Sequence, residues 1–311
     1  MRFNSEQIQK IGKEISNKVE GKTLFDEFSR GRYSTDASVY QIKPLGVVLP
    51  KDTNDVLNIM DYSQKNSIPL LARGGGSSQC GQTVGESIVL DYSKHQNKIL
   101  EINVQEKYVW VEPGVVLDHL NSYLKPYGLW FPVDVSTSSR ATIGGMSANN
   151  SCGSRSLYYG NMVHNVLAIE AILDDGSLHT FNEINKNYLT TTNNQDRFYK
   201  IIDKFLHLRQ KVSKDIDDNW PTTQRRVGGY NIDLINPKGF NSSHLLVGSE
   251  GTLNYFTAIS LKLSPLPSQK VMGICHFPTF YQAMDSTQHI VKLGPTAVEL
   301  IDRTMIDLAR D

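Results

Sequence analysis

Apolar residues recur at helical spacing in several segments of the chain. The pattern over residues 4–19 is typical of an amphipathic helix. A second helix is expected over residues 51–67, where Asp52 and Thr53 are good N-terminal capping residues. Further segments with helical character are residues 115–125, 195–218, 279–292 and 297–311. The chain is therefore expected to carry helices along its whole length.

Short apolar runs bounded by Gly, Pro and polar residues predict the strands. Single strands are expected at residues 44–50, 68–73, 86–93 and 271–277. Alternating residues on both sides of Gln105–Glu106 predict one hairpin, and Asp175–Gly176 is a strong turn signal for a second hairpin. Residues 244–267 are expected to supply two more strands. Strands mixed with helices in this way indicate an α+β fold class.

The segment "RGGGSS", residues 73–78, directly follows a predicted strand. Consecutive glycines allow backbone N–H groups to converge on an anion such as a phosphate, although a tight turn explains the segment equally well. It is not a dinucleotide-binding G-x-G-x-x-G motif, because Gln79 stands at the sixth position from Gly74. Nor is it a P-loop, because no lysine follows the glycines.

Two later segments are also rich in small residues. In residues 141–154, Asn149 and Asn150 are suited to hydrogen-bond a ring or a ribose, but a helix start packed on a sheet is the alternative. In residues 247–253, a hairpin turn between two strands explains the glycines about as well as a ligand contact does. The long segment 134–161 is expected to be an irregular loop, and loops of that length are uncommon unless they are functional or disordered.

Composition narrows the function classes. The chain is 39% hydrophobic and 21% charged, with 32 basic and 32 acidic residues, so nothing favours nucleic acid or an anionic membrane as a partner. No apolar run approaches the roughly 18 residues of a membrane-spanning helix, and the N-terminus lacks the apolar core of a signal peptide. Cys80, Cys152 and Cys275 form no C-x-x-C pair. We therefore expect a cytoplasmic protein.

Five of these stretches, in this order, resemble the FAD-binding domain of the vanillyl-alcohol-oxidase superfamily, also called the PCMH type. The resemblance runs from about Tyr33 to Pro267 and rests on residues 44–50, 68–82, 111–134, 141–176 and 245–253. Within the superfamily the chain is similar to the D-lactate, glycolate and D-2-hydroxyglutarate dehydrogenases. Residues 32–50 and 225–235 resemble in particular large bacterial FAD/FMN-containing dehydrogenases that carry a further iron–sulfur domain.

The resemblance implies that FAD is the cofactor and that residues of each segment hold it. The first segment would wrap the pyrophosphate, Cys152 and Gly153 would pass near the isoalloxazine, and Val166 or Ile169 would lie against the adenine. The implied residues are Arg73, Gly74, Gly75, Gly76, Ser77, Ser78, Gln79, Gly81, Gln82, Pro132, Asp134, Ser136, Thr142, Gly144, Gly145, Ala148, Asn149, Cys152, Gly153, Gly160, Val166, Ile169, Glu250, Gly251 and Thr252.

The mode of attachment follows from the same resemblance. Covalent members of the superfamily carry a histidine in the first segment, where this chain has Ser77–Ser78, so non-covalent FAD is expected. Cys152 as a flavin attachment point is the alternative, and a small residue packed near the ring is the favoured interpretation.

The implied function is oxidation of a D-2-hydroxy acid to the 2-oxo acid, with hydride transfer to flavin N5 and an electron acceptor as second partner. Arg226 and Tyr230 are the substrate-side candidates, although an arginine pair is often simply solvated. The family's paired catalytic histidines and any metal lie in the cap domain, and the sequence contains no H-x-H motif and no iron–sulfur cysteine cluster. We therefore expect no metal site in this chain. We expect a further cap or iron–sulfur part as its partner.

Two other functions remain open. The chain is alternatively a FAD-binding fragment, or a subunit of a split enzyme, without activity of its own. A reductase of the same fold, of the enolpyruvyl-sugar type, fits the glycine segments less well. The expected organisation is a helical segment at residues 1–39, a FAD-binding domain at 40–266 with α/β subdomains 40–98 and 99–266, and the beginning of a cap domain at 267–311.

Overall fold

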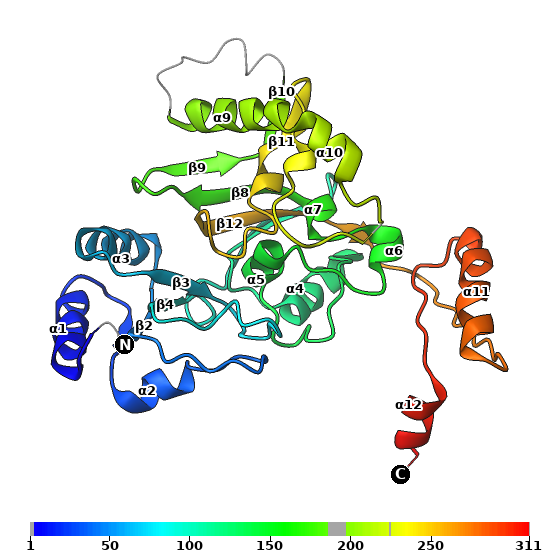
Figure 1. Ribbon diagram of the computed structural model, residues 1–311, viewed down its shortest axis with the longest axis horizontal. Helices are drawn as coiled ribbons and strands as arrows, with labels where there is room; N and C mark the ends of the chain where they lie inside the picture. Colours follow the sequence, from blue (N-terminus) through cyan, green and yellow to red (C-terminus); the bar gives the residue numbers. More distant parts are fainter. Residues whose placement is uncertain (1–2, 186–196, 224, 311) are drawn as a thin grey trace.

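The computed structural model describes residues 3–185, 197–223 and 225–310. Most of the chain is built around two β-sheets (Figure 1). The first has four strands in the order β1-β2-β4-β3, and the second has five in the order β5-β6-β12-β8-β9. Two short pairings, β10 with β11 and β13 with β7, complete the strand contacts of the described residues.

The first sheet is mainly parallel, and its two inner strands, β2 and β4, are buried. Its elements are α1 (Ser5–Ser16), β1 (Lys22–Leu24), α2 (Glu27–Arg32), β2 (Gly46–Leu49), α3 (Thr53–Asn66), β3 (Leu70–Arg73) and β4 (Ile88–Asp91). Strands β2 and β3 both pair in parallel with β4, which is buried along its whole length. Such a strand needs apolar side chains toward both faces, which explains why it reads Ile-Val-Leu rather than alternating. Asp52 caps α3 as expected, accepting from the backbone N–H of Asn54 and of Asp55.

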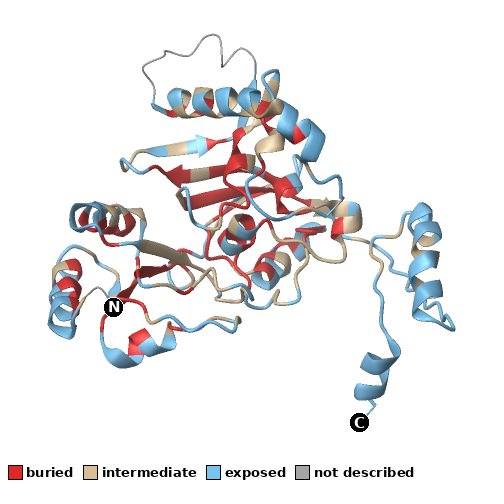
Figure 2. Cartoon of the chain, viewed as in Figure 1, coloured by how far each residue is buried: buried red, intermediate tan, exposed pale blue. Residues whose placement is uncertain are grey.

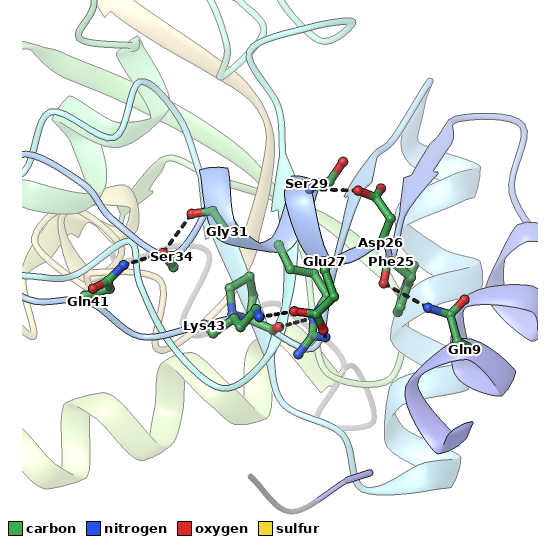
Figure 3. A network of polar contacts seen from close by, with 11 residues as sticks. Gln9, Phe25, Asp26, Glu27, Ser29, Gly31, Ser34, Gln41 and Lys43 are labelled. Atoms are coloured by element: carbon green, nitrogen blue, oxygen red, sulfur yellow. Dashed lines mark hydrogen bonds and ion pairs between the residues drawn. The ribbon is translucent and has the colours of Figure 1, made fainter. Parts of the chain in front are cut away.

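The N-terminal segment belongs to this first layer. It was expected to be helical, yet it also contributes the edge strand β1. Phe25 packs between Gly12 of α1 and Gly46 of β2, where an added Cβ would come within 2.7 and 2.2 Å of the ring. Figure 3 shows the polar contacts that hold α2, among them the Glu27–Lys43 ion pair. These contacts fix the helix against the sheet.

The second sheet is antiparallel and supports most of the remaining helices. Its layer consists of β5 (Ile99–Asn103), β6 (Tyr108–Val111), α4 (Leu117–Leu124), η1 (Lys125–Tyr127), β7 (Leu129–Trp130), α5 (Ile143–Asn149), α6 (Ser156–Tyr159), α7 (Met162–Asn165), β8 (Val166–Ile172), β9 (Leu178–Phe181), β10 (Glu183–Asn185), α9 (Arg197–Lys211), α10 (Ser213–Asn219), η2 (Ile232–Leu234), β11 (Gly239–Asn241), η3 (Ser242–Leu245), β12 (Tyr255–Lys262) and β13 (Ser264–Pro265). The central strand β12 pairs with β6 and β8. Phe131, Leu120 and Ile259 are fully buried in its core.

Most of the predicted elements are confirmed, and five expectations are corrected. The loop 134–161 contains the short helices α5 and α6, and α7 follows directly after it. Residues 195–218 form two helices, α9 and α10, with residues 195–196 outside the described part of the chain. Residues 271–277 are not a strand, and within 297–310 only α12 (Arg303–Leu308) is helical.

A further correction concerns residues 244–267, where the two strands, β12 and β13, both follow the glycine segment and no strand precedes it. The preceding residues form the 3₁₀ turn η3 instead. Its start is fixed by Asn241, whose side-chain oxygen accepts from the backbone N–H and the hydroxyl of Ser243. Local side-chain bonds of this kind offer the backbone an alternative to a strand ladder. The segment "VGSEGTL" is therefore not a hairpin turn.

After Pro267 the chain leaves the two layers and carries α11 (Phe280–Ile290), η4 (Val291–Leu293) and α12. No residue from 267 to 310 is buried, although Val271 and Leu293 are large apolar residues (Figure 2). None of the described helices is both long enough and apolar enough to cross a membrane.

Acid sensitivity is predicted from His244 in η3. Burial, together with the charge of His164, lowers the pKa of His244 to about 4. Between about pH 6.5 and pH 4, His244 therefore stays neutral in the folded state. In the unfolded chain the same histidine becomes protonated below its ordinary pKa of about 6.5. The free energy of unfolding is therefore highest above that pH. It decreases as the pH falls toward 4, by at most about 3 kcal/mol.

His244→Gln is expected to reduce this acid-dependent loss, because glutamine does not titrate. Urea unfolding at neutral pH and near pH 4 measures the difference in the free energy of unfolding. The exposed His95→Gln variant is the control and should behave like the parent chain. Equal acid losses in the parent and in His244→Gln would contradict the assignment.

Candidate functional site

A cavity of about 440 Å³ lies where the ends of β3 and β4 meet α5 and the residues before β12. Its walls come from both sheets. The lining residues are Ala72–Cys80, Gln82, Thr83, Tyr92, Pro113, Val135–Thr137, Ala141, Thr142, Gly144–Met146, Ala148–Cys152, Arg225, Val227, Glu250, Gly251, Asn254 and Phe256. The three glycine-rich segments of the sequence therefore converge on one cavity.

The first wall is the segment 74–76, which follows β3. A Cβ on Gly74 would stand 2.1 Å from the Thr142 hydroxyl oxygen, and a Cβ on Gly75 would stand 2.2 Å from the carbonyl oxygen of Arg140. Gly76 has a φ of +64°. These approaches leave no room for a side chain, so the cavity wall here is bare backbone.

The second wall is α5. Thr142 caps it by accepting from the backbone N–H of Gly145 at 3.3 Å. A Cβ on Gly144 would come within 2.6 Å of the Pro113 side chain, so the glycine allows the helix to pack closely beside β6. Two alternatives were open for this segment, a helix start made of small residues and a ligand contact. The structure contains the helix, and the helix lies at the edge of the cavity.

The third wall, residues 248–251, docks on the end of α5. The backbone N–H of Glu250 donates to the carbonyl of Ala148 at 2.9 Å, and the Asn149 amide donates to the Glu250 carboxylate at 2.9 Å. Glu250 has a φ of +51°, which is rare for a residue with a side chain. Burial raises the pKa of Glu250. The structure therefore holds a desolvated carboxyl group at the cavity edge.

The structure divides the residues expected to contact the cofactor into two sets. Those that line the cavity are Arg73, Gly74, Gly75, Gly76, Ser77, Ser78, Gln79, Gln82, Ser136, Thr142, Gly144, Gly145, Ala148, Asn149, Cys152, Glu250 and Gly251. Those outside its lining are Gly81, Pro132, Asp134, Gly153, Gly160, Val166, Ile169 and Thr252.

Several residues of the second set have evident structural roles. Asp134 accepts from the Ser154 hydroxyl and the Arg155 backbone N–H, both at 3.1 Å, and so closes the loop around Gly153. Val166 and Ile169 are buried core residues of β8.

The substrate-side candidates, Arg226 and Tyr230, do not line the cavity. The Arg226 guanidinium donates to both carboxylate oxygens of Asp233 and lies over the Trp220 ring. The Tyr230 hydroxyl lies 2.7 Å from the hydroxyl of Thr252. It is the neighbouring Arg225 that reaches the cavity, where its Nε donates to Cys152 Sγ at 2.8 Å.

Sequence reasoning also missed Tyr92, Asn254 and Phe256, which line the cavity from positions without a recognisable motif. Tyr92 directly follows β4, and the other two lie before and within β12. They reach the cavity because the end of β4 and the start of β12, which belong to different sheets, both lie beside it, and no spacing in the sequence reveals this.

Unpartnered polar atoms indicate what the cavity can hold. Among the described residues, the hydroxyl of Tyr92 and Nδ2 of Asn150 are buried at its wall without a hydrogen-bond partner. Buried polar atoms nearly always have a partner, so these two are suited to a polar ligand. Backbone amides free of side chains, together with such donors, fit a long phosphate-bearing molecule such as FAD.

Two family models match the chain. Residues 44–182 match the FAD binding domain, and residues 266–311 match the C-terminal domain of FAD linked oxidases. The first match includes the glycine segment after β3 and helix α5.

Three similar proteins are two dehydrogenases and a subunit of an oxidase. The chain is 33% identical over 298 residues to D-2-hydroxyglutarate dehydrogenase of Escherichia coli (strain K12), covering 94% of this chain and 29% of that protein. It is 29% identical to a probable mitochondrial D-lactate dehydrogenase of Danio rerio, covering 89% of this chain and 47% of the relative. It is 28% identical to glycolate oxidase subunit GlcD of Bacillus subtilis (strain 168), covering 98% and 56%. The chain thus spans under a third of the length of the D-2-hydroxyglutarate dehydrogenase that it matches.

The fold is also that of a solved structure. An alkyldihydroxyacetonephosphate synthase superposes with a TM-score of 0.63 at 19% identity, covering 93% of this chain and 50% of that one. The expected α+β fold, a FAD-binding domain followed by residues of a C-terminal oxidase domain, is confirmed. The chain belongs to the oxidase family with a PCMH-type FAD-binding domain, in the branch of the D-2-hydroxyglutarate, D-lactate and glycolate dehydrogenases.

Proposed function

We propose that this chain binds FAD non-covalently in the cavity and forms part of an enzyme that oxidises a D-2-hydroxy acid to the 2-oxo acid. The observation that carries the proposal is the bare backbone of Gly74–Gly76, facing α5 across a cavity to which Arg225 also contributes. Bound FAD would supply the hydride acceptor.

The chain's own residues would bind and orient the cofactor. Backbone N–H groups of Gly74–Gly76 and the hydroxyls of Ser77 and Ser78 would hold the pyrophosphate, since amides free of side chains suit phosphate oxygens. The unpartnered Tyr92 hydroxyl and Asn150 amide would donate to polar atoms farther along the ligand. With Ser77–Ser78 in place of the histidine of covalent members, nothing in this segment would attach the flavin.

Arg225 would hold the substrate carboxylate. An arginine guanidinium binds a carboxylate through two parallel hydrogen bonds, and its charge is permanent. The bond from its Nε to Cys152 Sγ leaves the terminal nitrogens for this purpose. Cys152 would thus position Arg225, which agrees with a packed residue near the ring and not with an attachment point.

A second candidate function is a flavin-binding part whose activity depends on residues outside this chain. The exposed apolar side chains of residues 267–310 favour it, because such surfaces usually pack against other protein. In either case we propose two α/β subdomains at residues 40–98 and 99–266, with the cap beginning at residue 267.

Gly75→Ala is expected to abolish FAD binding. The methyl group would meet the Arg140 carbonyl oxygen at 2.2 Å, and the backbone segment would have to move away from the cavity wall. Flavin stoichiometry of the purified protein is the measurement.

Gly85→Ala is the matched control for this variant. Gly85 lies in the same β3–β4 connection, and its added Cβ would make only ordinary contacts at 3.6 Å. Full flavin content in Gly75→Ala would refute the proposed role of the segment.

The non-covalent mode predicts that acid precipitation releases all of the flavin. The yellow colour should appear in the supernatant, and the pellet should be colourless. A Cys152→Ser variant should give the same partition, because Cys152 is not an attachment point. Flavin retained in the parent pellet and lost from the Cys152→Ser pellet would reverse this conclusion.

A D-2-hydroxy acid should bleach the visible flavin absorbance under anaerobic conditions. D-2-Hydroxyglutarate, D-lactate and glycolate are the test set, and L-lactate and NADPH are the controls for stereochemistry and for a reductase. Arg225→Met should weaken the apparent substrate affinity by about tenfold or more, the loss of one charge-assisted pair. Reduction by NADPH alone would exclude the proposal, and a yellow chain reduced by none of these compounds would favour the second candidate.

A further inference from the structure

A second cavity, of about 390 Å³, adjoins the flavin cavity and shares part of its wall. Arg73, Gly74, Gly75 and Thr142 line both. The rest of its lining comes from the end of α2, Asp91 at the end of β4, Ser93, the start of α4 and Ser139–Arg140. We call it the rear cavity. The proposed function assigns no role to it.

Two arginines give the rear cavity unbalanced positive charge. Arg32 and Arg140 both line it and are exposed, and in the part of the chain that the structure describes neither forms an ion pair. By contrast, Arg30 pairs with Glu27. A cation without a counter-ion at a concave surface attracts anions from solution.

The single carboxylate that lines the rear cavity is already satisfied. Asp91 accepts from the Tyr33 hydroxyl at 2.6 Å and from the hydroxyl and backbone N–H of Ser93 at 2.6 and 2.9 Å. The charge of Arg73 lies beside it. Arg73 donates in turn to three backbone carbonyls, which carry no net charge. No carboxylate of the cavity lining therefore balances the charges of Arg32 and Arg140.

Helix α4 adds a third positive feature. Its N-cap residue, Val116, lines the rear cavity and provides no side-chain cap, and His119 in its first turn lines the cavity too. The N-terminus of a helix favours negative charge through its dipole. Asp118 lies in the same turn but is exposed and does not line the cavity.

The arginines are held by ordered structure. Arg32 ends α2, whose start is capped by Asp26 and whose end is fixed by a hydrogen bond from the Ser34 hydroxyl to the Gly31 carbonyl at 2.7 Å (Figure 3). Arg140 follows a turn in which its own N–H donates to the carbonyl of Thr137 at 2.8 Å. Anchored backbones reduce the entropy lost when the side chains close on a ligand.

We propose that the rear cavity is a second anion site, for a phosphate dianion, either inorganic or carried as a monoester by a small molecule. Arg32 and Arg140 bind its oxygens, the hydroxyl of Ser139 donates a further hydrogen bond, and the dipole of α4 favours the negative charge. The volume leaves room beside the phosphate for the ester group.

Calorimetric titration of inorganic phosphate into the FAD-loaded chain, at constant ionic strength set with chloride, tests the site. Saturable binding with a single stoichiometry is expected. Arg140→Gln and Arg32→Gln should each weaken it by about tenfold or more, because each removes a charge-assisted hydrogen bond to the anion. Arg140→Lys should restore part of the affinity.

Arg225→Gln is the matched control, because it removes the same charge from the flavin cavity, and it should leave phosphate affinity unchanged. Binding lost in Arg225→Gln but kept in Arg140→Gln would place phosphate in the flavin cavity and overturn the proposal, as would the absence of saturable heat. Thermal unfolding verifies that each variant is folded.

Glycerol 3-phosphate distinguishes the two sources of the anion. Tighter binding than inorganic phosphate indicates a monoester ligand, and equal or weaker binding indicates inorganic phosphate. The titration is independent of the proposed function, because flavin content is read separately from the colour of the same sample.

Discussion

The whole site depends on one close contact between two stretches of backbone. Gly74 and Gly75, at the end of the parallel sheet, lie against Arg140 and Thr142, just before α5 of the antiparallel layer. Side chains on these glycines would overlap atoms of the second layer at little more than 2 Å. The two sheets can therefore approach only where the chain has no Cβ, and the flavin cavity is the space left beside this contact.

Arg73 stabilises the backbone around that contact. The family resemblance implied a different role for it, as part of the segment that wraps the FAD pyrophosphate. Its guanidinium donates to the carbonyls of Tyr33, Thr35 and Thr83 and lies over the Tyr33 ring. These bonds tie the segment after α2 to both ends of the glycine segment. Although Arg73 lines the flavin cavity, its donors are largely used within the protein, so phosphate binding would rest more on backbone amides than on this charge.

Much of the fold was predictable because it is encoded locally. Apolar periodicity gave α1 and β2, Asp52 marked the start of α3, and Asp175–Gly176 marked the β8–β9 turn. The glycine segments indicated an anionic ligand because consecutive glycines allow backbone N–H groups to converge on an anion. Where side-chain bonds decide the backbone, as Asn241 and Ser243 do at η3, an apolar run misled the prediction.

Adjacent residues of the same type were the hardest to separate from the sequence. Arg225 and Arg226 are neighbours, yet one reaches Cys152 at the cavity and the other is held by Asp233 and Trp220. Likewise Arg30 is paired, whereas Arg32 faces the rear cavity. The sequence by itself determined most of the elements, because these depend on local patterns, and its glycine segments indicated an anionic ligand. FAD as the cofactor was implied by the resemblance of five ordered segments to a known family. Only the tertiary structure decided which side chains are free to bind a ligand, because that depends on partners distant in the chain.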